Sequence, residues 1–236
     1  MSNAPITYWH QGISCVNEQW ENAYTKFETP SQEIKKFVGR FKAMGAERWT
    51  KDAQIVDLFC GRGNGLVALE KLGFQNLNGV DLSPDLVAQY DGPAKMYVAD
   101  CRFLKFDENS IDYVTLQGGL HHLESIENDV NKTLAEIHRS LKPNGHFVSV
   151  EPWNTPFLRF MHLTYKLKPI RAIWGKLDAL ATMTELEYPI YNNWIGAPAQ
   201  VLSLYKKYFE TVHLKFAWGK IQFVGKKKQL PNQGAQ

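Results

Sequence analysis

The stretch of sequence that decides the fold reads Ile55-Val56-Asp57-Leu58-Phe59-Cys60-Gly61-Arg62-Gly63-Asn64-Gly65. A short apolar run ends in a turn with glycine at every second position, and a helical pattern follows from Leu66. This order predicts a strand, a tight loop and a helix. Because glycine tolerates positive φ and has no Cβ, the loop would let backbone N–H groups approach a ligand beside a helix N-terminus.

Short apolar runs after this loop alternate with helical segments, which is typical of a parallel sheet wrapped by crossover helices. We therefore predict a doubly wound α/β fold with a mostly parallel seven-stranded sheet and an antiparallel closing hairpin. Lys142 to Gly145 is predicted to be a turn. The predicted strands are 54–59, 77–81, 96–100, 111–116 and 146–150, with 211–216 and 221–224 in the hairpin.

The sequence predicts a single domain over residues 1–228. The aromatic-rich stretch 152–197 is an addition to the alternating strands and helices of the fold. We interpret it as a helical cap over the edge of the sheet that binds the ligand. The parts in order are N-terminal helices (13–46), the ligand-binding core (53–151), the cap (152–197), a closing helix and hairpin (198–228) and a flexible tail (229–236).

One N-terminal helix carries an aromatic stripe. Trp20, Tyr24 and Phe27 fall at i, i+4 and i+7, which indicates a one-sided helix. Packing onto the core is the favoured interpretation. The alternative is a flap over the ligand, which would bring Tyr24 to the bound molecule.

Composition excludes several classes of protein. Hydrophobic and charged contents of 44% and 22% are ordinary for a folded soluble protein, and no apolar run reaches the length of a membrane span. The N-terminus lacks the features of a secretory signal, so a cytoplasmic location is expected. Cys15, Cys60 and Cys101 are scattered, which favours reduced thiols over disulfides or a zinc cluster. A net charge of +3 is too small to indicate a nucleic-acid partner.

The spacing of the glycines limits the classes of ligand that the loop can bind. A dinucleotide fingerprint would place its third glycine at Leu66 rather than Gly65, which argues against a nicotinamide cofactor. The spacing Asp57-x-x-x-Gly61-x-Gly63-x-Gly65 resembles motif I of the class I S-adenosylmethionine-dependent methyltransferases. The resemblance covers roughly 54–151. It implies a Rossmann-like methyltransferase fold, S-adenosylmethionine as cofactor and S-adenosylhomocysteine as product.

Further motifs follow in the order that this resemblance implies. Asp81 stands where the family's acidic residue accepts hydrogen bonds from both ribose hydroxyls. Asp100 would accept from the adenine amine, and Cys101 would donate its backbone N–H. The stretch 115–123 is similar to the one that lines the methionine arm and the methyl acceptor. The implied cofactor-binding residues are Asp57, Gly61, Gly63, Gly65, Asp81, Leu82, Asp100, Cys101, Gln117 and Tyr24, and no metal site is predicted.

Two histidines are candidate bases for methyl transfer. An acceptor hydroxyl has to lose a proton, and neutral histidine suits that role near pH 7. His121 and His122 follow the fourth core strand, at the carboxyl edge where open α/β folds bind ligands. Catalysis by one of them and a purely structural role are both open, and His122 is the preferred base.

Glu151 closes the fifth core strand at the same edge. It could act as a base, accept a hydrogen bond from substrate or cap the following helix, and capping is the favoured interpretation. The aromatic residues of the cap suit an apolar or ring-bearing acceptor, or they form a small core of their own. They are Trp153, Trp174, Tyr188, Tyr191 and Trp194.

The predicted reaction is methyl transfer to a small molecule, with a hydroxyl oxygen as the preferred acceptor and nitrogen or carbon open. Nucleic acid is disfavoured because Gln117-Gly118-Gly119-Leu120 replaces the Asn/Asp-Pro-Pro-aromatic motif of base amino-methyltransferases. A non-catalytic methyltransferase-like binding or scaffold protein is the remaining alternative. A monomer or homodimer is expected, without a membrane partner.

Overall fold

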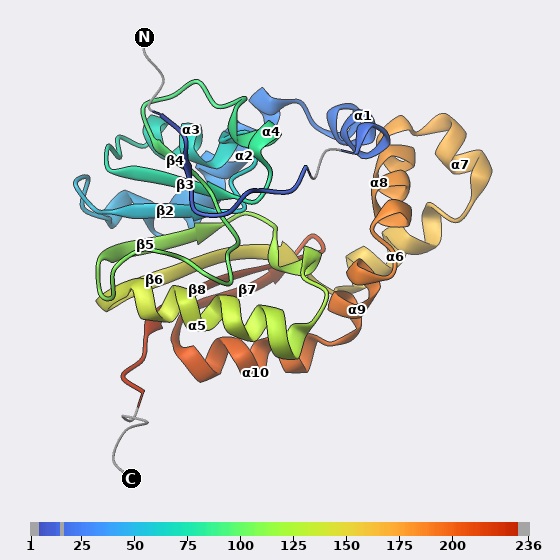
Figure 1. Ribbon diagram of the computed structural model, residues 1–236. Coiled ribbons are helices and arrows are strands. Elements are labelled where there is room, and N and C mark those ends of the chain that lie inside the picture. Colours follow the sequence, from blue (N-terminus) through green and yellow to red (C-terminus); the bar gives the residue numbers. More distant parts are fainter. Residues whose placement is uncertain (1–4, 15–16, 231–236) are drawn as a thin grey trace.

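An eight-stranded sheet forms the centre of the computed structural model, which describes residues 5–14 and 17–230 (Figure 1). Its order is β1-β4-β3-β2-β5-β6-β8-β7, and β8 runs antiparallel to both of its neighbours. The other pairs are parallel. The strands are β1 (Thr7–Tyr8), β2 (Ile55–Leu58), β3 (Leu77–Asp81), β4 (Lys95–Val98), β5 (Ile111–Leu116), β6 (Leu141–Pro152), β7 (Phe209–Ala217) and β8 (Lys220–Lys227).

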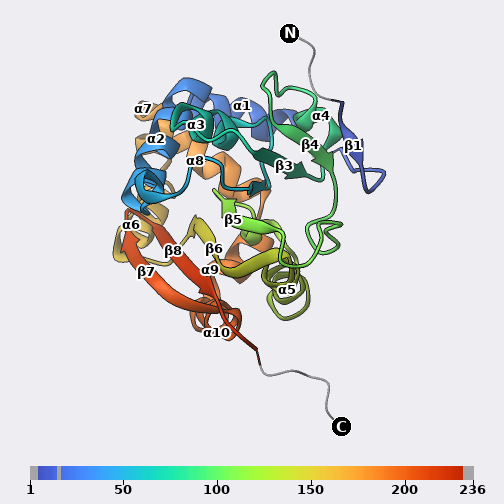
Figure 2. The ribbon, with the colours of Figure 1, turned by 90° about the vertical axis from the view of Figure 1, so that its left-hand side faces the viewer.

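Helices cover both faces of the sheet, with α2 and α3 on one side and α5 and α10 on the other (Figure 2). The α-helices are α1 (Glu18–Phe27), α2 (Pro30–Ala43), α3 (Asn64–Lys71), α4 (Pro84–Val87), α5 (Asn131–Ser140), α6 (Pro156–Thr164), α7 (Lys168–Ile173), α8 (Gly175–Leu186), α9 (Ile190–Gly196) and α10 (Pro198–Tyr208). Short helical turns are η1 (Ala46–Arg48), η2 (Leu120–His122) and η3 (Ile126–Val130), the last a π-helix.

Side chains alternate between two apolar cores along the central strands. Val56 and Leu58 of β2 pack toward α5 and α10, whereas Ile55 packs toward α2 and α3. Burial on both faces explains why these strands read as continuous apolar runs in the sequence. The doubly wound α/β fold and its antiparallel closing hairpin are therefore confirmed.

Two details of the prediction were wrong. The sheet has eight strands rather than seven, because Thr7 and Tyr8 pair with β4 at the edge. A strand of two residues is too short to show an alternation of apolar and polar side chains. It is therefore recognised only from its pairing with β4. The turn predicted at 142–145 is a bulge inside β6, since Leu141 pairs with Ile111 and His146 with Tyr113. Asn144, with φ of 68°, takes up the extra length.

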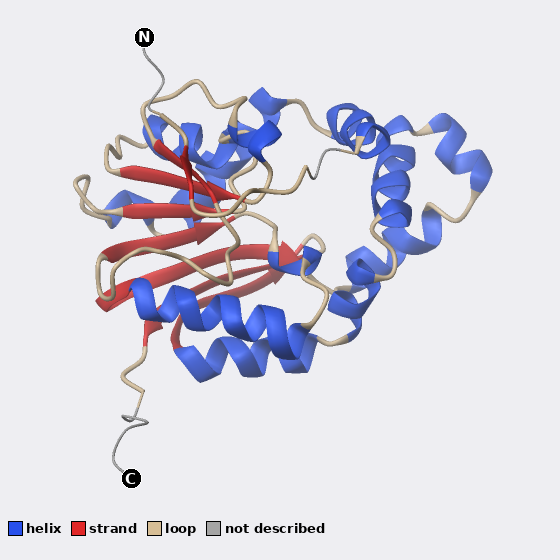
Figure 3. Ribbon diagram, viewed as in Figure 1, coloured by secondary structure: helices blue, strands red, loops and turns tan. Residues whose placement is uncertain are grey.

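The segment predicted as a cap forms α6 to α9 and extends beyond one end of the sheet (Figures 1 and 3). Helix α1 packs against α8 through Ala23, Ala179 and Met183, so the N-terminal helices meet the cap. In the described ranges, 5–14 and 17–230, no helix is long and apolar enough to cross a membrane. Cys60 and Cys101 are free and buried. Cys15 and residues 231–236 of the predicted tail lie outside the described ranges.

Candidate active site

The three glycines of the loop between β2 and α3 have different surroundings. Gly61 has φ of 51°, and a Cβ built there would meet nothing within 4 Å. A Cβ on Gly63 would lie 2.2 Å from the Tyr90 ring, and one on Gly65 would lie 2.2 Å from Oδ2 of Asp57. Only Gly61 therefore borders open space, and the other two glycines are needed for packing beneath the loop.

Asp57 braces this loop from below. Its carboxylate is buried and accepts a hydrogen bond from Oγ1 of Thr115 at 2.6 Å. Burial, opposed by that hydrogen bond and reinforced by the charge of Asp81, raises the pKa of Asp57 to about 7. Its observed contacts tie β2, β5 and Gly65 together, and its direct contact with cofactor stays a prediction.

Asp81 connects the end of β3 to the glycine loop. Oδ2 accepts from the Gly61 N–H at 2.8 Å, and Oδ1 accepts from the Ser83 N–H at 2.9 Å. Burial raises the pKa of Asp81, while these backbone donors hold it down. Each carboxylate oxygen can accept a further hydrogen bond, so the geometry leaves room for two ribose hydroxyls.

Asp100 accepts hydrogen bonds from Arg102, a residue that was not predicted to lie in the site. The Arg102 guanidinium donates from Nε and Nη2 to both carboxylate oxygens, with the shortest contact at 2.7 Å. Burial opposes this effect, but the Arg102 hydrogen bonds leave the pKa of Asp100 lowered. An adenine amine would have to share these oxygens with Arg102. Cys101 is buried beside Thr133, and burial raises its pKa to about 12.

Gln117 presents an unused donor at the carboxyl end of β5. Arg40 of α2 donates from Nη1 to Gln117 Oε1 at 3.3 Å, which turns the Nε2 group the other way. Nε2 is buried and has no hydrogen-bond partner in the described part of the chain. Because a buried amide without a partner is costly, this atom indicates a place that a bound acceptor group would fill.

Helix α1 connects the glycine loop, α2 and the cap. Tyr24 donates its hydroxyl to Glu33, which also accepts from Nδ2 of Asn64 at 2.7 Å. Arg62 of the loop pairs with Glu21 of α1. Trp20 donates from Nε1 to Oε1 of Glu187, just beyond α8, at 2.6 Å.

Glu33 was not predicted to be a site residue, although its position in the sequence carries a signal. Glu33 is buried on the same face of α2 as Phe37 and Phe41, at i, i+4 and i+8. A carboxylate on an otherwise apolar helix face needs buried partners, and here they are Tyr24 and Asn64. Tyr24 therefore lies beside the start of α3, with its hydroxyl engaged by Glu33.

His121 and Glu151 form a buried pair. His121 Nδ1 lies 2.7 Å from Glu151 Oε2, and Oε1 accepts from the N–H groups of Gly119 and Leu120 at 3.0 and 2.9 Å. Glu151 thus holds the η2 turn that precedes it in the chain. The expectation that it caps the following helix was wrong, because Thr155 caps α6.

Burial sets the charge state of this pair. It lowers the pKa of His121 and raises that of Glu151, because both charged forms are desolvated. The two backbone donors mark Glu151 as the acceptor, which assigns the proton of neutral His121 to Nδ1 and leaves Nε2 as a free acceptor.

His122 stands next to this pair and reaches solvent. The two imidazole rings lie 4.0 Å apart, and 43% of the His122 side chain is exposed. Its Nδ1 lies 3.6 Å from Oε1 of Glu187. The pKa of His122 is lowered, first by desolvation and then by His121. Nε2 of neither histidine has a hydrogen-bond partner among the described residues.

Lys220 brings a positive charge to the same edge. It opens β8 opposite Pro152, one residue past Glu151. Desolvation and the nearby charge of Arg40 lower its pKa, whereas Glu151 and Glu187 raise it. No pattern in the sequence distinguishes this lysine, because the register of β6 and β8 places it.

The cap aromatics divide into two groups. Trp153, Tyr191 and Trp194 are buried, and Trp194 donates from Nε1 to the Pro152 carbonyl at 2.8 Å. Tyr191 approaches His121 edge-to-face, with ring centroids 6.2 Å apart. Trp174 and Tyr188 are exposed. Tyr191 is therefore the cap ring beside the histidines, while Trp194 is part of the core.

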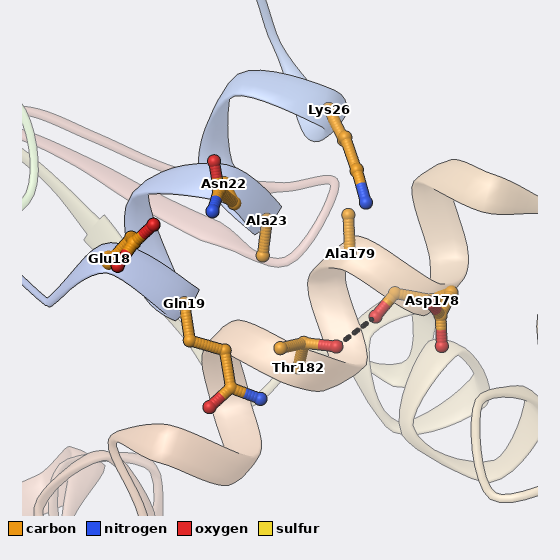
Figure 4. Close-up of a pocket in the computed structure, with 8 residues that line it drawn as sticks. All are labelled: Glu18, Gln19, Asn22, Ala23, Lys26, Asp178, Ala179 and Thr182. Carbon is orange, nitrogen blue, oxygen red and sulfur yellow. Dashed lines mark hydrogen bonds between the residues drawn. The ribbon is translucent and has the colours of Figure 1, made fainter.

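A separate pocket of about 430 Å³ lies between α1 and α8 (Figure 4). Six of its eight lining residues have polar side chains, and none of the predicted site residues lines it in the described part of the chain. It is therefore distinct from the edge that carries the glycine loop and the histidines. Its lining residues are Glu18, Gln19, Asn22, Ala23, Lys26, Asp178, Ala179 and Thr182.

Comparison with known proteins agrees with this geometry. The model of a methyltransferase domain family matches residues 56–149, which contain the glycine loop, Asp81 and both histidines. Residues 56–149 therefore form a methyltransferase domain, and the resemblance to S-adenosylmethionine-dependent methyltransferases is confirmed.

Two relatives and two solved structures give the extent of the similarity. A demethylmenaquinone methyltransferase of Staphylococcus epidermidis is 29% identical over 180 residues, covering 67% of this chain and 72% of the relative. That of Staphylococcus aureus is 32% identical and covers 58% of each chain. A Pyrococcus horikoshii structure is 20% identical, with a TM-score of 0.67, covering 90% of this chain and 100% of its own. A putative methyltransferase of Methanococcus maripaludis is 14% identical, with a TM-score of 0.62, covering 93% and 99%.

Proposed function

We propose that this methyltransferase acts on a small, apolar or ring-bearing molecule and that a hydroxyl oxygen is its preferred methyl acceptor. The single observation that carries this proposal is the pair of histidines at the carboxyl edge of the sheet, each with Nδ1 near a carboxylate and Nε2 free. This arrangement suits removal of a proton from an acceptor hydroxyl. The relatives named demethylmenaquinone methyltransferases are consistent with a small-molecule acceptor.

The cofactor is proposed to lie between the glycine loop and Gln117. Open space beside Gly61, the two carboxylate oxygens of Asp81 and the unpartnered Nε2 of Gln117 are the groups that fit it. S-adenosylmethionine supplies an activated methyl group when bound, so the chain needs chiefly to position the acceptor. Leu82, Asp100, Cys101 and Tyr24 keep their predicted cofactor contacts as part of this proposal.

His122 is proposed as the base and His121 as the residue that positions it. His122 is the more exposed of the two, and Glu187 faces its Nδ1. His121 is fixed by Glu151, which also holds the η2 turn that carries both rings. Lys220 would stabilise negative charge that develops on the acceptor oxygen. Tyr191 lies where an acceptor ring would pack.

The test is methyl transfer from labelled S-adenosylmethionine to a panel of phenols, quinols, amines and carboxylic acids. S-adenosylhomocysteine measures turnover, and NMR of the labelled product shows which atom carries the methyl group. A phenol or another hydroxyl compound is expected to accept the label, and His122→Ala is expected to abolish transfer while the cofactor still binds. Transfer only to amines or carbon acceptors would refute the oxygen assignment. The expected monomer or homodimer and the cytoplasmic location remain predictions.

A further inference from the structure

An exposed apolar surface covers the outer end of the cap. On α6, Phe157, Phe160 and Leu163 recur at i, i+3 and i+6 and all are exposed. Helix α7 has no buried residue, and Ile173 at its end is 89% exposed. We define the cap patch as Phe157, Phe160, Leu163, Leu167, Ile173 and Trp174. Several large apolar side chains exposed on two successive helices are typical of an interaction surface.

The tip of the β7–β8 hairpin extends this patch. Trp218 is 78% exposed, and its ring contacts that of Phe157 with centroids 5.2 Å apart. The end-on view shows α6 beside the hairpin (Figure 2). Two separate parts of the chain therefore present aromatic side chains to solvent at the same end of the molecule.

The segment that carries the patch has charged side chains of one sign. From Pro152 to Leu177 the chain has five lysines and arginines and no aspartate or glutamate. Lys166, Lys168 and Lys176 are exposed and have no ion-pair partner among the described residues. Within the ranges 5–14 and 17–230, Arg159 donates a hydrogen bond only to a neutral group, Oδ1 of Asn154. Arg171 is paired with both Asp178 and Glu185 of α8, so this cation adds no net positive charge to the surface.

We propose that the cap patch docks on an anionic lipid surface, with its aromatic and aliphatic side chains in the interface and its lysines against the headgroups. Apolar residues bordered by lysine and arginine are the features that place helices in a membrane interface. A second copy of the chain fits less well, because a symmetric contact would bring these cations against one another. The proposal revises the expectation of no membrane partner, and it rests on this surface rather than on the identity of the acceptor.

Vesicle co-sedimentation of the full chain tests the proposal. The protein is expected to bind phosphatidylcholine vesicles that contain phosphatidylglycerol, to bind pure phosphatidylcholine weakly, and to dissociate as salt is raised. Lys166→Glu/Lys168→Glu is expected to lower apparent affinity roughly tenfold or more. The matched control, Lys95→Glu/Lys105→Glu, changes the same number of exposed lysines elsewhere and should bind like wild type.

A second pair of matched variants tests the contribution of the apolar side chains to vesicle binding. Phe160 and Phe103 are 60% and 58% exposed, so either can be changed to serine with little effect on the core. Phe160→Ser is expected to weaken vesicle binding about tenfold, and Phe103→Ser to leave it unchanged. No binding to anionic vesicles, or equal binding by both variants, would overturn the proposal. So would a wild-type dimer that Ile173→Ser dissociates, because the patch would then be a contact between copies.

Discussion

Nδ1 of His121 lies 2.7 Å from Oε2 of Glu151, and the Glu151 carboxylate is fully buried. The other oxygen of Glu151 holds two backbone N–H groups of the turn that carries both histidines. One carboxylate therefore fixes the tautomer of His121 and the position of His122. We therefore propose that Glu151 is a positioning residue rather than a base.

Glu151→Gln tests that role. The amide keeps an oxygen for the backbone donors but presents N–H to His121, so it favours the tautomer with the proton on Nε2. We expect methyl transfer to fall roughly 100-fold, within the range for loss of general base catalysis. Cofactor affinity, measured by calorimetry, should stay within about twofold. A variant as active as wild type would show that the tautomer is irrelevant.

The pH dependence of methyl transfer follows from the lowered pKa values of both histidines. A base must be neutral, and a pKa below its ordinary 6.5 keeps imidazole neutral as the pH falls through 6.5. We expect kcat to persist through that pH and to decline only at lower pH. The measurement is kcat against pH, with cofactor affinity measured alongside. An inflection at or above the ordinary histidine pKa would contradict the assignment.

Substitution of Gly65 should mainly lower stability, whereas substitution of Gly61 should mainly lower cofactor affinity. Gly65→Ala places a Cβ 2.2 Å from Asp57 Oδ2 beneath the loop, so it should destabilise the fold by about 1–3 kcal/mol. Gly61→Ala meets no protein atom, so its stability cost should be limited to about 1–2 kcal/mol of left-handed strain while cofactor affinity falls. Thermal unfolding and calorimetry measure the two effects. Equal cofactor affinity of Gly61→Ala and wild type would place the ligand elsewhere.

Gln117→Leu should weaken cofactor binding without unfolding the protein. The change removes a buried N–H2 that has no partner among the described residues, but it also removes the oxygen to which Arg40 donates, so the cofactor-free protein should lose at most about 1–3 kcal/mol of stability. If Nε2 serves the cofactor, affinity should fall roughly tenfold, as expected for one lost hydrogen bond. Gln117→Glu, which keeps the contact with Arg40 but loses the donor, is the matched variant. Unchanged affinity in both variants would remove Gln117 from the site.

Local patterns were enough to predict the parallel core. The glycine loop and Asp81 are next to strands whose apolar runs are visible, and parallel strands bring their carboxyl ends to one edge. Lys220 and Glu187 reach the site through long-range arrangement, namely the register of β6 with β8 and the packing of α1 on α8. No single-sequence pattern encodes those contacts. Glu33 is an intermediate case. The sequence shows that it lies on an apolar helix face, but it does not show which residues it contacts.

Parallel measurement of methyl transfer and cofactor binding in His122→Ala tests the central claim most directly. The wild-type chain is expected to bind S-adenosylmethionine and to methylate a hydroxyl-bearing small molecule. The variant is expected to bind the cofactor with unchanged affinity and to lose at least about 100-fold in kcat. Full activity in the variant, or equal loss of cofactor binding and turnover, would contradict a catalytic role for the histidine.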